Sequence, residues 1–214
     1  MDAFEGGQDD DLPGWELQFR FSSGRLCLAF CATVGERWRR SFERLREPID
    51  LGRWVVAAGL VEHAPNVDAR LLDEARELRE AIYRLVRAAI DRQPSGPADR
   101  DLLNTWAATA DLAPRLAADG TRVYQAGRAL ARSCLATVAR DAVDLLSGPE
   151  ITHVRECAAS DCALLFVDRS RPGRRRWCSE RACGTKNRSA AYRRRRQGPA
   201  QGAPEHVGRN APRA

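Results

Sequence analysis

Two short stretches decide the fold of the C-terminal part of the chain: CAASDC over residues 157–162 and CSERAC over residues 178–183. Each stretch holds two cysteines with four residues between them, and fifteen residues separate the two pairs. A tetrahedral zinc ion takes four ligands at ~2.3 Å from each sulfur, and this spacing lets two local turns face each other around one ion. We therefore predict one structural Zn²⁺ whose ligands are Cys157, Cys162, Cys178 and Cys183.

Four buried thiols, or two disulfides in an exported protein, are the alternatives to a zinc site. A segment of about fifty residues with few large apolar side chains gains little from a hydrophobic core, whereas zinc binding supplies on the order of 10 kcal/mol of folding free energy. Four thiolates leave no open coordination position, so the predicted ion is structural and not catalytic. His153 is near enough in the chain to compete as a ligand, and we rank it below the four cysteines.

The residues around the cysteines predict a small α+β domain over 148–197. Short strands are expected at residues 151–155, 163–167 and 174–178. A helix is expected from residue 180 to 197, with Ser179 as its N-cap. This order of knuckle, hairpin and helix is the layout of a treble-clef finger.

Positive charge is concentrated in the same segment. Residues 151–197 hold thirteen arginine or lysine residues against four acids, a net charge of +9, so the +6 of the whole chain leaves −3 for the remainder. A basic end on a mildly acidic protein indicates a polyanionic partner. The candidate nucleic-acid contacts are Arg174, Arg175, Arg176, Lys186, Arg188, Arg193, Arg194, Arg195 and Arg196.

Duplex DNA is the favoured partner because a lone basic helix fits the major groove. The chain also lacks the aromatic sheet motif of common single-strand readers. Trp177 and Tyr192 are candidate stacking or packing groups beside the basic residues. Three alternatives stay open: an RNA partner, an acidic protein docked by the finger of an adaptor, and arginines that serve only the thiolate site and the helix end.

Residues 13–147 predict a mainly α-helical domain. Apolar residues recur at helical spacing over 67–92, with Asn66 as the expected N-cap, and again over 127–146. Shorter helices are expected near residues 25–34, 50–60 and 98–110. Asp119-Gly120 predicts a small β-hairpin.

The remaining cysteines and the two ends of the chain indicate no catalytic or metal-binding role. Cys27, Cys31 and Cys134 fall on apolar helix faces, where buried thiols are favoured over a thiol pair. His63 and His206 are assigned no role. The acidic residues 1–12 and the Gly- and Pro-rich residues 198–214 are expected to be disordered tails.

Several classes of protein are disfavoured by the sequence. No apolar run reaches the length that a membrane span needs. The first residues lack the basic start and apolar stretch of a secretion signal, which predicts a cytoplasmic protein. We find no nucleophile–base grouping and no phosphate loop, so we expect no enzyme activity.

Residues 177–195, WCSERACGTKNRSAAYRRR, resemble the CGNR-type zinc finger, and residues 24–30, GRLCLAF, resemble the start of the ABATE domain that precedes this finger in many bacterial proteins. Thr185 and Lys186 stand where the name-giving tetrapeptide has Asn and Arg, and lysine cannot reproduce the bidentate geometry of arginine. The resemblance implies a bacterial transcription regulator, linked to stress.

Together these observations predict a DNA-binding regulator with a helical domain for sensing or assembly. One finger offers a small contact area, so a homodimer or a partner such as RNA polymerase is expected to add specificity.

Overall fold

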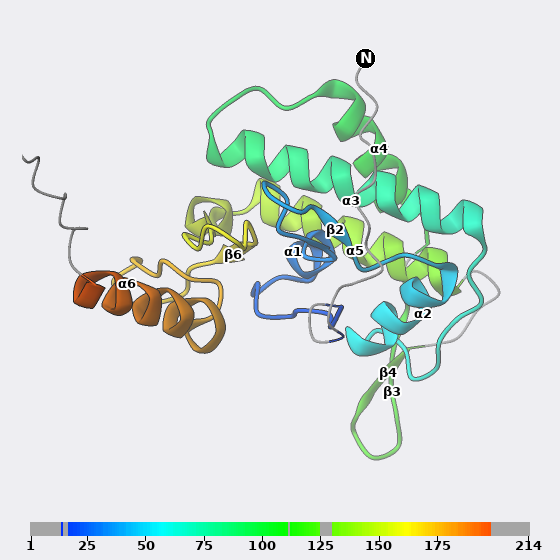
Figure 1. Ribbon diagram of the computed structural model, residues 1–214. Helices are drawn as coiled ribbons and strands as arrows, with labels where there is room; N and C mark the ends of the chain where they lie inside the picture. Colours follow the sequence, from blue (N-terminus) through cyan, green and yellow to red (C-terminus); the bar gives the residue numbers. More distant parts are fainter. Residues whose placement is uncertain (1–13, 15–16, 111, 125–129, 198–214) are drawn as a thin grey trace, which may run out of the picture.

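The computed structural model describes residues 14, 17–110, 112–124 and 130–197. Both expected tails, residues 1–12 and 198–214, lie outside this range. Figure 1 shows a helical body with a smaller C-terminal part beside it. The α-helices are α1 Leu26–Cys31, α2 Pro48–Ala57, α3 Ala69–Ile90, α4 Pro97–Ala108, α5 Leu130–Ser147 and α6 Thr185–Gln197. The strands are β1 Val34–Gly35, β2 Phe42–Glu43, β3 Pro114–Leu116, β4 Arg122–Tyr124, β5 Val154–Glu156 and β6 Leu165–Val167.

The predicted mainly helical N-terminal part is confirmed. α3, α4 and α5 pack against one another, and the short α1 packs against α3 and α5. The core comprises the apolar faces that helical spacing predicts, including Leu78 and Ile82 of α3 and Leu135 and Leu145 of α5. Among the described residues, no helix is both long and apolar enough to cross a bilayer.

The N-cap of α3 is Asp68 and not Asn66, which corrects the expectation from the sequence. The Asp68 carboxylate accepts a hydrogen bond from the Leu71 amide at 2.7 Å. Asp and Asn are both good N-caps, so the sequence alone offered two neighbouring candidates. The expected start of the second long helix, residues 127–129, lies outside the described residues.

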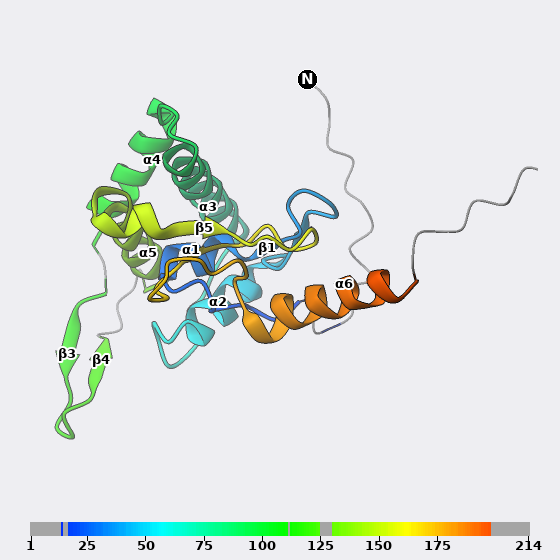
Figure 2. The same cartoon turned by 90° about the vertical axis from the view of Figure 1, so that its left-hand side faces the viewer.

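Two antiparallel hairpins belong to the helical part. The predicted one is β3–β4, which pairs Pro114 with Tyr124 and extends away from the body (Figures 1 and 2). The other, β1–β2, was not predicted, because two-residue strands leave no periodic signal. Gly35 is required in β1, since a Cβ there would lie 2.3 Å from the Phe42 ring that covers it.

The C-terminal part begins with a 3₁₀ turn, Pro149–His153, and the antiparallel pair β5–β6. It continues through the π-helical turn η3, Glu180–Gly184, into α6. The combination of cysteine cluster, small strands and helix confirms the predicted fold class. The third predicted strand, at 174–178, is wrong. This segment pairs with no strand, and the Arg176 carbonyl accepts from the Ala158 amide at 2.8 Å instead.

Strand β6 is shared by two hydrophobic cores. Leu165 and Val167 belong to the core of the helical body. Leu164 and Phe166, whose side chains alternate with these, belong to a second core that includes the four zinc-finger cysteines. The expected domain boundary between residues 147 and 148 stays a prediction. Side chains that follow this boundary, Val154, Leu165 and Val167, complete the helical core.

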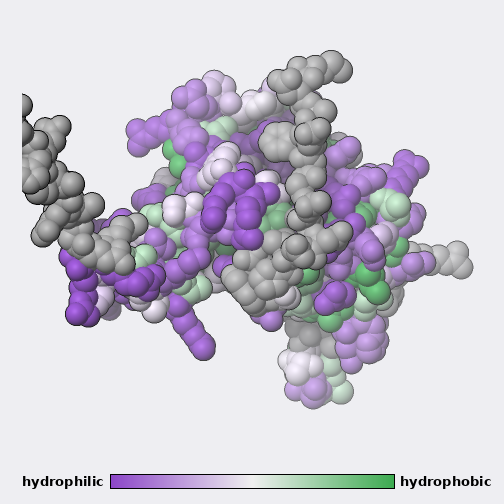
Figure 3. Space-filling view, in the orientation of Figure 1, coloured by the Kyte–Doolittle hydropathy of each residue, from purple (hydrophilic) through white to green (hydrophobic). Residues whose placement is uncertain are grey.

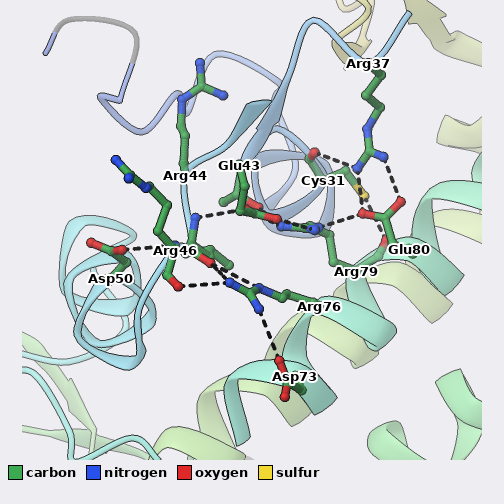
Figure 4. Close-up of polar contacts among 12 residues, drawn as sticks. Cys31, Arg37, Glu43, Arg44, Arg46, Asp50, Asp73, Arg76, Arg79 and Glu80 are labelled. Carbon is green, nitrogen blue, oxygen red and sulfur yellow. Dashed lines mark hydrogen bonds and ion pairs between the residues drawn. The ribbon is translucent and has the colours of Figure 1, made fainter. Parts of the chain in front are cut away.

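A buried arginine links the β1–β2 hairpin to α3. The Arg79 side chain is 4% exposed, and its guanidinium donates to Glu43 at 2.7 Å and to Glu80 at 2.8 Å (Figure 4). It also donates to the Thr33 hydroxyl at 3.0 Å. Burial disfavours the cation, but hydrogen bonds and the charges of Glu43 and Glu80 outweigh it and raise the pKa of Arg79. This network fixes the hairpin on the helical body.

Candidate metal centre and basic surface

The structure brings the sulfurs of Cys157, Cys162, Cys178 and Cys183 together. All four Sγ atoms lie within 4.8 Å of one another and are buried. The Cys162–Cys178 and Cys178–Cys183 sulfur separations are 3.5 Å and 3.7 Å. A tetrahedron with ~2.3 Å metal–sulfur bonds spaces its sulfurs ~3.8 Å apart, so the cluster fits one zinc ion. His153 is exposed and belongs to no such cluster in the part of the chain that is described.

The backbone shapes the cluster for thiolates. The Cys178 amide donates to the Cys157 sulfur at 3.4 Å. Ala163, which follows the first knuckle, has a φ of +57°, in the left-handed region. The knuckle therefore holds a strained backbone, and the surrounding contacts maintain it.

Arg175, one of the predicted nucleic-acid contacts, is directed into the finger. Its guanidinium donates to the carbonyls of Trp177, at 2.7 Å, and of Cys178, and it lies 4.9 Å from the centre of the Phe166 ring. The Arg175 amide donates to the buried carboxylate of Asp168 at 2.9 Å. Arg175 thus positions the segment that carries Cys178.

The second knuckle leads directly into α6. The Ser179 hydroxyl accepts from the Ala182 amide at 3.2 Å, which confirms Ser179 as the N-cap. The Cys183 amide donates to the Ser179 carbonyl at 2.9 Å, and the Asn187 side chain donates to the Cys183 carbonyl at 2.8 Å. Zinc at this cluster would fix the first turn of the helix.

Two of the basic residues on α6 are paired within the finger. Lys186 forms an ion pair with Asp161 of the first knuckle, and Arg188 forms one with Glu180. Both cations stay largely exposed, with 64% and 60% of their side-chain surface accessible. Exposed pairs of this kind contribute only about 0–1 kcal/mol, so a polyanion can compete for either cation.

The other predicted basic residues face solvent. Arg174 and Arg176 are exposed, and the Arg176 guanidinium lies 5.0 Å from the centre of the Trp177 ring. Arg193, Arg195 and Arg196 are exposed on the last turns of α6, whereas the side chain of Arg194 lies outside the described part. Figure 3 shows hydrophilic residues gathered over α6. We call the exposed cations of this helix, with Arg174 and Arg176, the basic surface.

A cavity of about 250 Å³ lies between part of the finger and part of the helical body. Ala182 and Lys186 line it on the finger side, and Gly35, Glu36 and Phe42 line it on the body side. This junction was not predicted from the sequence. Its one signal was the run ERWRR at residues 36–40, in which three arginines surround a tryptophan.

The three cysteines outside the cluster are buried, as predicted. Cys27 and Cys134 are fully buried, and the Cys31 thiol donates to the Arg79 carbonyl at 3.7 Å. Burial raises the pKa of Cys31 and of Cys134 to about 12, so both remain thiols at neutral pH.

Comparison with protein-family models confirms the resemblance found in the sequence. A model named ABATE, described as "Putative stress-induced transcription regulator", matches residues 24–149. A CGNR zinc-finger model matches residues 153–196, which contain all four clustered cysteines. Neither model describes an enzyme. A comparison with curated proteins gave no match.

Proposed function

Because the chain belongs to the ABATE family, whose model covers more than half of its 214 residues, we propose that it is a transcription regulator that binds duplex DNA through α6. The proposal joins two statements: the chain is a regulatory protein with a zinc finger, and its finger presents a basic helix. The exposed basic helix is the reason for proposing DNA as the partner.

The observation that supports DNA binding most directly is the exposure of α6. No residue of this helix with a described side chain is buried, and its only half-buried residues are Asn187, Ala190 and Ala191. The helix projects from the body in both ribbon views (Figures 1 and 2). Its 13 residues span ~20 Å at 1.5 Å per residue, a length that can lie in a major groove.

Zinc supplies the folding free energy that a finger with so small a core lacks. The chain's own residues then present the helix: Ser179 caps η3, Asn187 ties the first turn of α6 to Cys183, and Arg175 holds the preceding segment. In this proposal the phosphate contacts are Arg174, Arg176, Lys186, Arg188, Arg193, Arg194, Arg195 and Arg196. Each contact releases counterions from the DNA, so the affinity falls steeply as salt rises.

The helical body serves sensing or assembly in this proposal. A single finger buries little surface, so useful specificity requires a second copy of the chain or a partner such as RNA polymerase.

The test is fluorescence-anisotropy binding of the zinc-loaded full chain to mixed-sequence duplex DNA across a salt series. The variant replaces Arg193, Arg195 and Arg196 with Gln. Its matched control replaces three exposed arginines of the helical body with Gln: Arg53, Arg70 and Arg84. Both variants therefore lose three positive charges. A truncation is unsuitable, because β6 completes the helical core.

We expect the wild type to bind with a log K against log salt slope of roughly −4 to −8, and the α6 variant to lose about three units of that slope. The control should bind like the wild type. Failure of the wild type to bind duplex DNA at low salt would reject the proposal in favour of an acidic protein partner. Tighter binding to RNA of the same sequence would reassign the helix to RNA.

A further inference from the structure

One side of α6 is attached to the finger. Four residues at the spacing of a single helix face mark this side: Cys183, Asn187, Ala190 and Ala191. The Cys183 sulfur belongs to the metal cluster, and the Asn187 side chain donates to the Cys183 carbonyl at 2.8 Å. The two alanines are half-buried, as Asn187 is. A partner of the finger therefore meets the opposite side of the helix.

The opposite side carries three hydroxyl side chains, which we call the hydroxyl row: Thr185, Ser189 and Tyr192. Residues at positions i, i+4 and i+7 lie one above the other on a helix, so the row is a single stripe along α6. All three side chains are exposed, that of Tyr192 to 55%. Thr185 donates to the Glu180 carbonyl at 3.3 Å. In the part of the chain that is described, no group hydrogen-bonds the hydroxyl of Ser189 or of Tyr192.

Exposed cations flank the hydroxyl row on both sides. Lys186 and Arg193, about two turns apart, lie along one border of the row. Arg188 and Arg195, also about two turns apart, lie along the other border. Among the described residues, no carboxylate pairs with Arg193 or Arg195. Arg196 continues the row at its C-terminal end, with its guanidinium 5.8 Å from the centre of the Tyr192 ring. Uncharged hydrogen-bonding groups thus lie between two lines of positive charge.

We propose that Ser189 and Tyr192 contact base edges in the major groove and determine the sequence preference of the protein. The inference rests on the proposed function and assigns separate roles to the hydroxyl row and to its borders. An α-helix with its side chains is about 10–12 Å across, and the major groove is about 12 Å wide. When α6 lies in the groove with its attached side outward, the hydroxyl row meets the floor, where the base edges lie. The two borders then meet the two phosphate backbones.

The chemistry of the two side chains fits the groups that base edges present. The Ser189 hydroxyl both donates and accepts, so it can bond to a purine N7 or to the amino group of cytosine. The Tyr192 ring offers an apolar surface to the methyl group of thymine, and its hydroxyl offers a further hydrogen bond. Phosphates are the same at every position of the duplex, so the border cations add affinity and no sequence information. The hydroxyl row meets the groups that differ between base pairs.

The experiment compares three full-length, zinc-loaded proteins: the wild type, the row variant Ser189→Ala/Tyr192→Ala and the border variant Arg193→Gln/Arg195→Gln. Each protein is bound to a pool of duplexes with a randomised segment, and the bound duplexes are sequenced. Fluorescence anisotropy across a salt series then compares the duplex that the wild type prefers with a mixed-sequence duplex. Alanine and glutamine are both good helix formers, so each variant is a control for the other in the same helix. Zinc content and melting temperature verify that all three proteins are folded.

We expect the wild type to bind its preferred duplex more tightly than the mixed-sequence duplex. The row variant should reduce this ratio of affinities by roughly tenfold and keep the salt slope of the wild type. The border variant should keep the ratio and lower the slope by about two units.

Three results would overturn the inference and leave the proposed function standing. The row variant could keep the sequence preference of the wild type, or the wild type could bind DNA without any preference. The row variant could also lose as much salt slope as the border variant, which would identify phosphate contacts in place of base contacts. If the wild type itself fails to bind duplex DNA, the inference and the proposed function are both overturned.

Discussion

The guanidinium of Arg79 is buried between the carboxylates of Glu43 and Glu80 (Figure 4). Replacing it with Met would remove the cation that pairs with Glu43 in a poorly solvated site, and it would leave Glu80 with Arg37 alone. We expect Arg79→Met to lower the free energy of unfolding by about 3 kcal/mol, the lower end for buried pairs, because both carboxylates keep part of their solvent contact. Arg84→Met is the control: Arg84 is 57% exposed and pairs with Asp99, so its loss should cost about 0–1 kcal/mol. Urea unfolding measures both, and equal costs would contradict the account.

Glu80 should make the stability depend on pH in the acid range. Burial raises its pKa, but the hydrogen bond and charge of Arg37, followed by those of Arg79, outweigh burial and lower the pKa below its ordinary value of 4.5. A lowered carboxyl pKa stabilises the fold above the unfolded-state pKa, and this contribution is lost as the pH falls through the folded-state pKa. Glu80→Gln should therefore lose less stability than the wild type between about pH 5 and pH 3. Urea midpoints across this range test the prediction, and parallel curves would refute it.

At this scale the sequence predicted the four metal ligands but not the function of each basic residue. The cysteine spacing carried the zinc prediction together with the hairpin and helix expected around it and the small apolar core of this segment. Nothing in the sequence distinguished Arg175, which holds carbonyls of the finger, from its neighbours Arg174 and Arg176, which are exposed. Adjacent arginines look alike in the sequence, and the contacts of Arg175 with the Phe166 ring and with the carbonyls of Trp177 and Cys178 appear only in the folded chain.

Among the elements, α6 depends most on its attachment to the metal site. A free helix of 13 residues is marginal in water, and this one has almost no apolar face to pack. Removal of zinc by a chelator should therefore unfold η3 and α6 while α3 and α5 remain helical. Amide hydrogen exchange provides the measurement: residues 180–197 should lose protection, and residues 69–90 should keep it. Retained protection in α6 without zinc would show that other contacts hold the helix.

The long helices were predictable because their apolar positions repeat over five or six turns in α3 and α5. The two-residue strands β1 and β2 were not. β1 and β2 are too short for a periodic pattern, and they pair because Gly35 admits the Phe42 ring and Arg79 binds Glu43. The expected strand at 174–178 failed for the opposite reason. Its residues suit a strand, but the Arg175 side chain and the Asp168 carboxylate fix this backbone in an irregular path.

For the whole molecule, two cores meet at β6. Substitutions of two neighbouring residues there should therefore differ in whether their cost in stability depends on zinc. Leu165 packs in the helical core and Leu164 in the finger core. Each change to Ala should cost about 2–5 kcal/mol in the zinc-loaded protein. In zinc-free protein, where the finger is expected to be unfolded, Leu165→Ala should still destabilise the remaining fold and Leu164→Ala should not. Thermal unfolding with and without chelator measures this, and equal effects of Leu164→Ala in both states would contradict it.

The shared strand also limits how the chain can change in length. From Leu164 to Val167, each residue's place is fixed by an odd-or-even count, because neighbouring side chains serve opposite cores. Removing a single residue there would exchange every inward and outward position at once and turn Phe166 toward the wrong interior. Between Asp168 and Cys178 no such parity applies, since that path is irregular and largely at the surface. Natural insertions and deletions should therefore accumulate in the second interval and be purged from the first.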